Sequence, residues 1–87
     1  MNANEIQQQN IERLRTMLDG RVGEFLRAAR MDAHMSQPTL AKLLGWTRNM
    51  VANLETGRRV ARVEDFVLVA HALNIKPEKL LRRMLQW

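Results

Sequence analysis

The sequence of 87 residues contains no cysteine. This absence excludes disulfide bonds and thiolate metal sites, and it is compatible with a reducing environment. No apolar run reaches the roughly 18 residues that a membrane-spanning helix needs. The N-terminal segment is polar and does not have the composition of a secretory signal peptide. We therefore expect a cytoplasmic protein, and its length is that of one domain.

Proline is confined to two positions, and few segments have the composition of β-strands. Pro38 and Pro77 each lie near the start of a helical apolar pattern, where a missing backbone N–H costs little. Hydrophobic residues make up 46% of the chain, which can supply a modest core. The sequence therefore predicts an all-α fold. Its expected core side chains are Leu40, Ala41, Leu44, Val51, Leu54, Phe66 and Val69.

The apolar spacing predicts six helices. Their expected ranges are about 4–18, 21–33, 37–44, 48–56, 63–73 and 77–87. The pair Asp19-Gly20 is expected to break the chain between the first two of them. The sequence thus predicts a compact five-helix domain at residues 21–87 and an additional N-terminal helix, the extension, within residues 1–20.

Acidic residues are scarce in the middle of the chain. The formal net charge of the whole chain is +5. Residues 21–62 hold eight Lys or Arg against three Asp or Glu, which accounts for all of this excess. Residues 1–20 sum to −1 and residues 63–87 sum to +1. A polyanionic partner explains this concentration of positive charge, and a solvated surface is the alternative.

Residues 36–57 contain two short apolar patterns of helical spacing that are separated by a tight turn. Ser36 and Thr47 stand at the expected N-caps, where a hydroxyl accepts from a free backbone N–H. Gly45 and Gly57 stand where the two helices are expected to end. This arrangement predicts a helix-turn-helix, and it makes DNA binding the leading hypothesis.

Three polar side chains lie between the apolar positions of the second of these helices: Arg48, Asn49 and Asn53. In the major groove of DNA, arginine can pair with guanine and asparagine with adenine. The alternative is an ordinary polar helix face without a ligand. Given the helix-turn-helix motif, contact with base edges is the interpretation that we prefer.

Arg58, Arg59 and Arg62 follow the second helix in an expected loop. Arginine binds phosphate through a rigid fork of donors, so these three residues are candidate contacts to the DNA backbone. Thr47 is a further candidate, as a hydroxyl that caps the helix and contacts a phosphate. Lys42 lies on a polar helix face and is either a phosphate ligand or a solvated side chain.

Further motifs extend beyond the two short helices. The ordered set consists of Arg30, Ser36-Gln37, Leu40-Ala41, Leu44-Gly45, Val51, Leu54-Glu55, Gly57-Arg58-Arg59, Ala70 and Ala72-Leu73. This set resembles the phage-repressor-type helix-turn-helix family, also described as Xre or Cro/repressor-like domains. The combination is specific, although each pair alone is weak. His34 departs from the pattern, because the family usually has glycine there and the position often requires a positive φ.

The resemblance implies roles for several residues. Arg48 and Asn49, at the N-terminal end of the recognition helix, reach the base edges first. Gln37 contacts a phosphate, and an ion pair between Arg30 and Glu55 orients the recognition helix. The resemblance also implies a homodimer on a palindromic operator of double-stranded DNA, because such domains act as symmetric dimers.

Two surfaces are candidates for that dimer contact. The first is the last helix, with Leu81, Met84, Leu85 and Trp87. The alternative is the leading helix, with Ile11, Leu14 and Leu18. For both surfaces, packing within the chain is an equally good interpretation of the apolar pattern.

The sequence shows no catalytic triad, no glycine-rich phosphate loop and no cluster with metal-ligand spacing. We therefore expect neither an enzyme nor a cofactor nor a metal site. The main expectation is a transcriptional regulator, most concretely a repressor that occupies an operator as a dimer. The alternatives are an antitoxin that binds a toxin protein and represses its own operon, and a structural module that has lost nucleic-acid binding. Co-purification of a second small protein would distinguish the antitoxin from the repressor. Salt-sensitive DNA binding would distinguish the repressor from the structural module.

Overall fold

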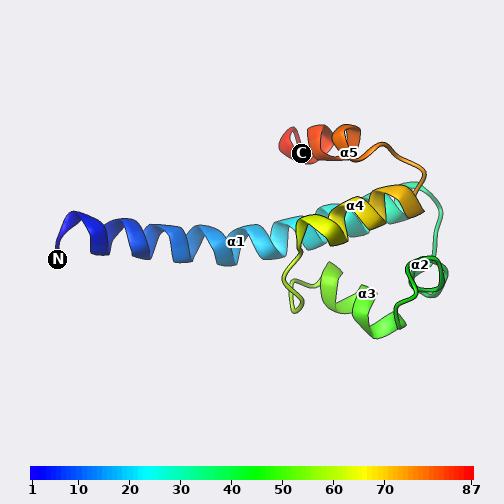
Figure 1. Ribbon diagram of the computed structural model, residues 1–87, viewed down its shortest axis with the longest axis horizontal. Helices are drawn as coiled ribbons and strands as arrows, with labels where there is room; N and C mark the ends of the chain where they lie inside the picture. Colours follow the sequence, from blue (N-terminus) through cyan, green and yellow to red (C-terminus); the bar gives the residue numbers. More distant parts are fainter.

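The computed structural model describes residues 1–87 and contains five α-helices and no strand (Figure 1). The all-α prediction is therefore confirmed. The helices are α1 (Ala3–Asp32), α2 (Gln37–Leu44), α3 (Arg48–Glu55), α4 (Val63–Ala72) and α5 (Pro77–Leu85). None of them combines the length and the apolar character that crossing a membrane requires.

The first two predicted helices are one continuous helix, so the predicted break at Asp19-Gly20 is wrong. Gly45 and Gly57 are the two glycines with positive φ. Gly20 instead has the backbone conformation of the surrounding helix. A glycine inside a helix costs about 1 kcal/mol relative to alanine. That cost does not break a helix whose C-terminal half is held by packing. The N-terminal half of α1 projects from the helical body along its longest dimension of 49 Å (Figure 1).

The ends of α2 and α3 follow the sequence prediction. The hydroxyls of Ser36 and Thr47 each accept a hydrogen bond of 3.2 Å from the backbone N–H three residues ahead. Gly45 ends α2 in the left-handed region, at φ +70°. His34 and Asn74 also have positive φ, at 55° and 59°. His34 therefore adopts the backbone conformation for which the resembling family usually has glycine.

The core lies between the C-terminal half of α1 and the other four helices. Eleven apolar residues are buried there: Phe25, Leu26, Ala29, Leu40, Ala41, Val51, Leu54, Val69, Ala70, Leu73 and Leu80. Five of the seven expected core residues are among them, whereas Leu44 and Phe66 are only partly buried at its edge. Leucine and alanine predominate in this small core, and Phe25 is its one aromatic residue.

Gly23 in α1 and Gly57 after α3 let the end of α3 come close to α1. A Cβ atom on Gly23 would lie 2.5 Å from the backbone oxygen of Leu54 and 2.6 Å from that of Glu55. The loop after α3 makes a similar approach, since a Cβ atom on Gly57 would lie 3.2 Å from Cα of Gly20. The backbone of α1 is thus the support against which the last turn of α3 rests.

The start of α4 lacks a capping acceptor. Arg62 is the N-cap residue, and its side chain has only donors. Asp65 supplies the other half of a capping box, because its Oδ2 accepts from the Arg62 N–H at 3.2 Å.

We expect Arg62→Ser to be more stable to unfolding than Arg62→Ala by about 1 kcal/mol, because serine adds the missing acceptor for the first turn. The measurement is urea denaturation of both variants beside the parent chain. The alanine variant is the matched control, since it removes the same guanidinium. Equal stability of the two variants would contradict the capping argument.

Candidate nucleic-acid interface

One face of α3 is polar, exposed and without partners. Arg48, Asn49 and Asn53 are all exposed, and none of their side chains forms a hydrogen bond or ion pair within the chain. The opposite face of the same helix buries Val51 and Leu54 completely or almost completely. The three candidate base-contacting residues are therefore brought together on a helix whose other side is fixed in the core.

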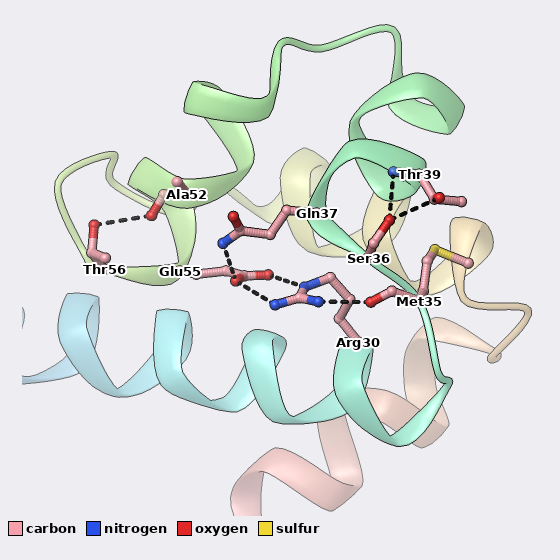
Figure 2. Close-up of polar contacts among 8 residues, drawn as sticks. All are labelled: Arg30, Met35, Ser36, Gln37, Thr39, Ala52, Glu55 and Thr56. Atoms are coloured by element: carbon pink, nitrogen blue, oxygen red, sulfur yellow. Dashed lines mark hydrogen bonds and ion pairs between the residues drawn. The ribbon is translucent and has the colours of Figure 1, made fainter.

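A buried polar cluster joins α3 to α1 and α2 (Figure 2). Arg30 donates to both carboxylate oxygens of Glu55, from Nε at 2.7 Å and from Nη2 at 3.1 Å. A third donor, Nη1 of Arg30, bonds the backbone oxygen of Met35 at 2.6 Å. The two residues are only 8% and 4% exposed, so the ion pair is shielded from water. Arg30 and Glu55 thus form the contact that the resemblance implied, and they join α1 to α3.

Gln37 belongs to the same cluster. Its Nε2 donates to Oε1 of Glu55 at 3.0 Å, which ties the first residue of α2 to the last residue of α3 (Figure 2). An amide nitrogen has two hydrogens, so one donor of Gln37 is free for an external acceptor. Gln37 therefore links the two helices, and its second amide hydrogen has no partner within the chain.

Arg59, a predicted phosphate ligand, has partners within the chain. Its guanidinium forms an ion pair with Asp65, with Nη2 and Oδ1 3.2 Å apart. The same group lies 4.7 Å from the centre of the Trp46 ring, a cation–π distance. Asp65 is 2% exposed. Arg59 therefore connects the α2–α3 turn to α4.

The other predicted phosphate ligands are accessible. Lys42, Thr47, Arg58 and Arg62 are exposed. Arg62 approaches Glu64 at 3.5 Å, but both side chains are about 70% exposed (73% and 68%). A pair this exposed contributes little energy, so the guanidinium of Arg62 is free to bind an external anion.

Arg27 also lies at this surface, although it was not among the residues predicted from the sequence. This exposed side chain lines a shallow hollow of about 540 Å³ between α1, α2 and α3, together with Gln37 and Arg48. The sequence contained no motif for it, because its place beside α2 and α3 depends on the packing of α1. The only signal was its share of the positive charge in the middle of the chain.

The predicted dimer patch on α5 and the following residues is only partly free. Leu81, Leu85 and Trp87 are 44%, 76% and 47% exposed, and Met84 is half-buried. The Trp87 ring packs edge-on against Phe25, with the ring centres 5.4 Å apart. This packing joins the end of the chain to α1.

An apolar groove lies beside this patch, between α1, α4 and α5. Its volume is about 320 Å³. We call it the apolar groove and define it by Val22, Phe66, Val67, Leu81 and Met84, which are among the residues that line it.

Known proteins resemble this chain in sequence and in fold. Residues 21–84 match the family of helix-turn-helix domains. The 10 kDa protein of the ImmF control region of Bacillus phage phi105 is 30% identical over 60 residues, which cover 68% of this chain and 67% of that protein.

Two solved structures are similar to this one. The clp gene regulator ClgR from C. glutamicum is 26% identical, with a TM-score of 0.72 over 79% of this chain and 90% of that one. The restriction-modification controller protein C.AhdI from Aeromonas hydrophila is 36% identical, with a TM-score of 0.64 over 70% of this chain and 88% of that one.

Proposed function

The chain belongs to the helix-turn-helix domain family, and from this premise we propose that it is a sequence-specific regulator of transcription that represses by occupying an operator in double-stranded DNA as a dimer. The observation that carries the proposal is the exposed, unpartnered face of α3 with Arg48, Asn49 and Asn53. The relatives support it by their descriptions, which are a phage control-region protein, a gene regulator and a controller protein.

The chemistry of that face suits the major groove. The groove admits one α-helix, and it presents acceptors on guanine and a donor–acceptor pair on adenine. Arg48 has the fork of donors that matches guanine, and Asn49 and Asn53 have the carboxamides that match adenine. The buried pair of Arg30 and Glu55 holds α3 in a fixed orientation, so the helix itself needs little ordering when DNA binds.

Contacts to the DNA backbone position the helix. We assign them to Lys42, Thr47, Arg58 and Arg62, and to the free amide hydrogen of Gln37. Arg27 joins this group, because it shares a surface hollow with Gln37 and Arg48. These contacts are independent of sequence, and they make binding weaken as the salt concentration rises.

Dimerisation supplies affinity that a single short recognition helix lacks. A symmetric pair places two copies of α3 about one turn of DNA apart, near 34 Å. The patch of Leu81, Met84, Leu85 and Trp87 contributes to the contact between the copies. Occupation of the operator then blocks polymerase. The protein therefore acts in the compartment that holds the DNA. The antitoxin alternative requires a second small protein that co-purifies, and none of the relatives named above is described as an antitoxin.

Selection of bound DNA from a random pool tests the proposal. The expected product is one enriched palindromic sequence, which gives the half-site and the spacing together. If the chain retains the DNA pool at low salt only and enriches no sequence, it binds phosphates without recognising bases. No retention at any salt concentration would overturn the proposal altogether.

We expect Arg48→Ala to weaken binding to the selected operator by about 1–3 kcal/mol and to relax the preference at one base position, because a base contact is lost. Arg58→Ala is the matched control, and it should weaken binding to operator and random duplexes alike. Fluorescence anisotropy at several salt concentrations measures both variants. Equal losses for Arg48→Ala on the two duplexes would contradict its assignment.

A further inference from the structure

The N-terminal half of α1 carries large apolar side chains that the core does not cover. They are 43–77% exposed and comprise Met1, Ile6, Ile11, Leu14, Met17 and Leu18. Residues 1–18 are all exposed, and this segment extends away from the body in Figure 1. So much apolar surface on one projecting helix indicates a binding partner.

Three of these residues form a stripe. Ile11, Leu14 and Leu18 recur at helical spacing and so share one side of α1. Val22 and Phe25 continue the same side into the C-terminal half of the helix. Val22 is also a wall of the apolar groove. The stripe therefore leads directly to the groove, and both lie on the same side of the molecule.

This arrangement is self-complementary. When an apolar ridge adjoins an apolar groove, a two-fold rotation can bring the ridge of each copy to the groove of the other. Two α1 helices that cross in antiparallel orientation near Leu18 bring Ile11 and Leu14 of one copy to the Val22 side of its partner. One chain therefore supplies both the ridge and the groove that a second copy needs.

The charges permit the same pairing. Residues 3–18 sum to zero, because Glu5 and Glu12 balance Arg13 and Arg15. Residues 76–87 sum to +3, because four Lys or Arg face only Glu78 in this segment. A neutral docked segment therefore meets no net repulsion at the basic segment that borders the groove.

We propose that residues 3–18 of α1 dock, in each copy, into the apolar groove of a second copy of this chain. The inference rests on the proposed function, which requires a dimer, and it names the surface that makes one. A stable interface buries about 800 Å² per partner. The α5 patch alone is small for this purpose, since Leu81 and Trp87 are already more than half covered within the chain. A docked helix of sixteen residues, about 24 Å long, supplies the missing contact.

Sedimentation equilibrium of the full chain without DNA tests the proposal. The parent chain and Gln9→Glu should be dimers, and Leu14→Glu should raise the dimer dissociation constant by about 100-fold or more, since two buried leucines are lost per dimer. Gln9 is the matched control, because it lies on the opposite side of α1 and the substitution introduces the same charge. A monomeric parent chain, or an unchanged dimer of Leu14→Glu, would overturn the proposal.

Disulfide formation in trans is a second test, because the parent chain has no cysteine. A chain with Leu14→Cys is mixed with a chain with Leu81→Cys under mild oxidation. The mixed disulfide should form readily, and Gln9→Cys mixed with Leu81→Cys should react much more slowly. Equal rates for the two mixtures would show that the stripe does not lie in the partner's groove.

DNA binding separates this inference from the proposed function. Leu14→Glu should bind a duplex with one half-site as the parent chain does, and should lose affinity for the full palindrome. If Leu14→Glu binds the palindrome as tightly as the parent chain, the docking proposal fails and the regulator remains. If the parent chain shows no base preference, the proposed function fails whatever the oligomeric state.

Discussion

Glu55→Gln is expected to lower the free energy of unfolding by about 3–5 kcal/mol, the largest effect of any single substitution considered for this chain. The carboxylate of Glu55 is buried and accepts from two nitrogens of Arg30 and from Gln37. A carboxamide of the same shape carries no charge and can accept on only one side. The guanidinium of Arg30 is then left in the interior without a counter-charge, which is costly. Urea denaturation followed by circular dichroism measures the loss.

A double replacement separates the pair's effect on stability from its effect on orientation. Arg30→Met combined with Glu55→Leu removes both charges, and it should recover most of the lost stability. The same variant should still bind the operator more weakly than the parent chain, because the link that orients α3 is gone. A Glu55→Gln chain within about 1 kcal/mol of the parent would contradict the importance of this buried pair.

Gly23→Ala is expected to lower the free energy of unfolding by about 2 kcal/mol, even though alanine favours the helix by about 1 kcal/mol. The added Cβ would meet the backbone oxygens of Leu54 and Glu55 at 2.5 and 2.6 Å. Backbone atoms cannot swing away as a flexible side chain can, so α3 has to move from α1. The affinity for the operator should fall as well.

Gly20→Ala is the control for this prediction. Gly20 lies in the same helix three residues earlier, and a Cβ atom there meets nothing within 4 Å. This variant should gain up to about 1 kcal/mol of stability from helix propensity. Thermal denaturation of both variants against the parent chain measures the contrast. A Gly23→Ala chain as stable as Gly20→Ala would show that α3 does not rest closely on α1.

The ends of α2 and α3 could be predicted from the sequence because their signals are local. Ser36 and Thr47 cap the N–H groups three residues ahead, and Gly45 supplies a backbone conformation that other residues avoid. The apolar spacing within each short helix also determines which face is buried. The exposure of Arg48, Asn49 and Asn53 follows from that spacing alone.

The features that sequence analysis missed depend on contacts between distant segments. The pair Asp19-Gly20 has the composition of a turn, yet it is helical, because packing on α3 and on the loop at Gly57 outweighs a local preference. Arg59 is adjacent in sequence to Arg58, yet only Arg59 meets a buried acid and a tryptophan ring. Local composition cannot distinguish these two arginines, since the difference comes from where α4 lies.

Because α1 is unbroken, its N-terminal half is rigidly connected to the half that packs on α3. An α-helix advances about 1.5 Å and turns about 100° with every residue. One residue added between Asp19 and Val22 would therefore swing the N-terminal arm by that angle relative to α3. In a dimer joined through this arm, the two copies of α3 would rotate relative to each other. The number of base pairs between the two half-sites would change as a result. In such an assembly, the length and helical phase of α1 would determine which operators a pair of chains can span.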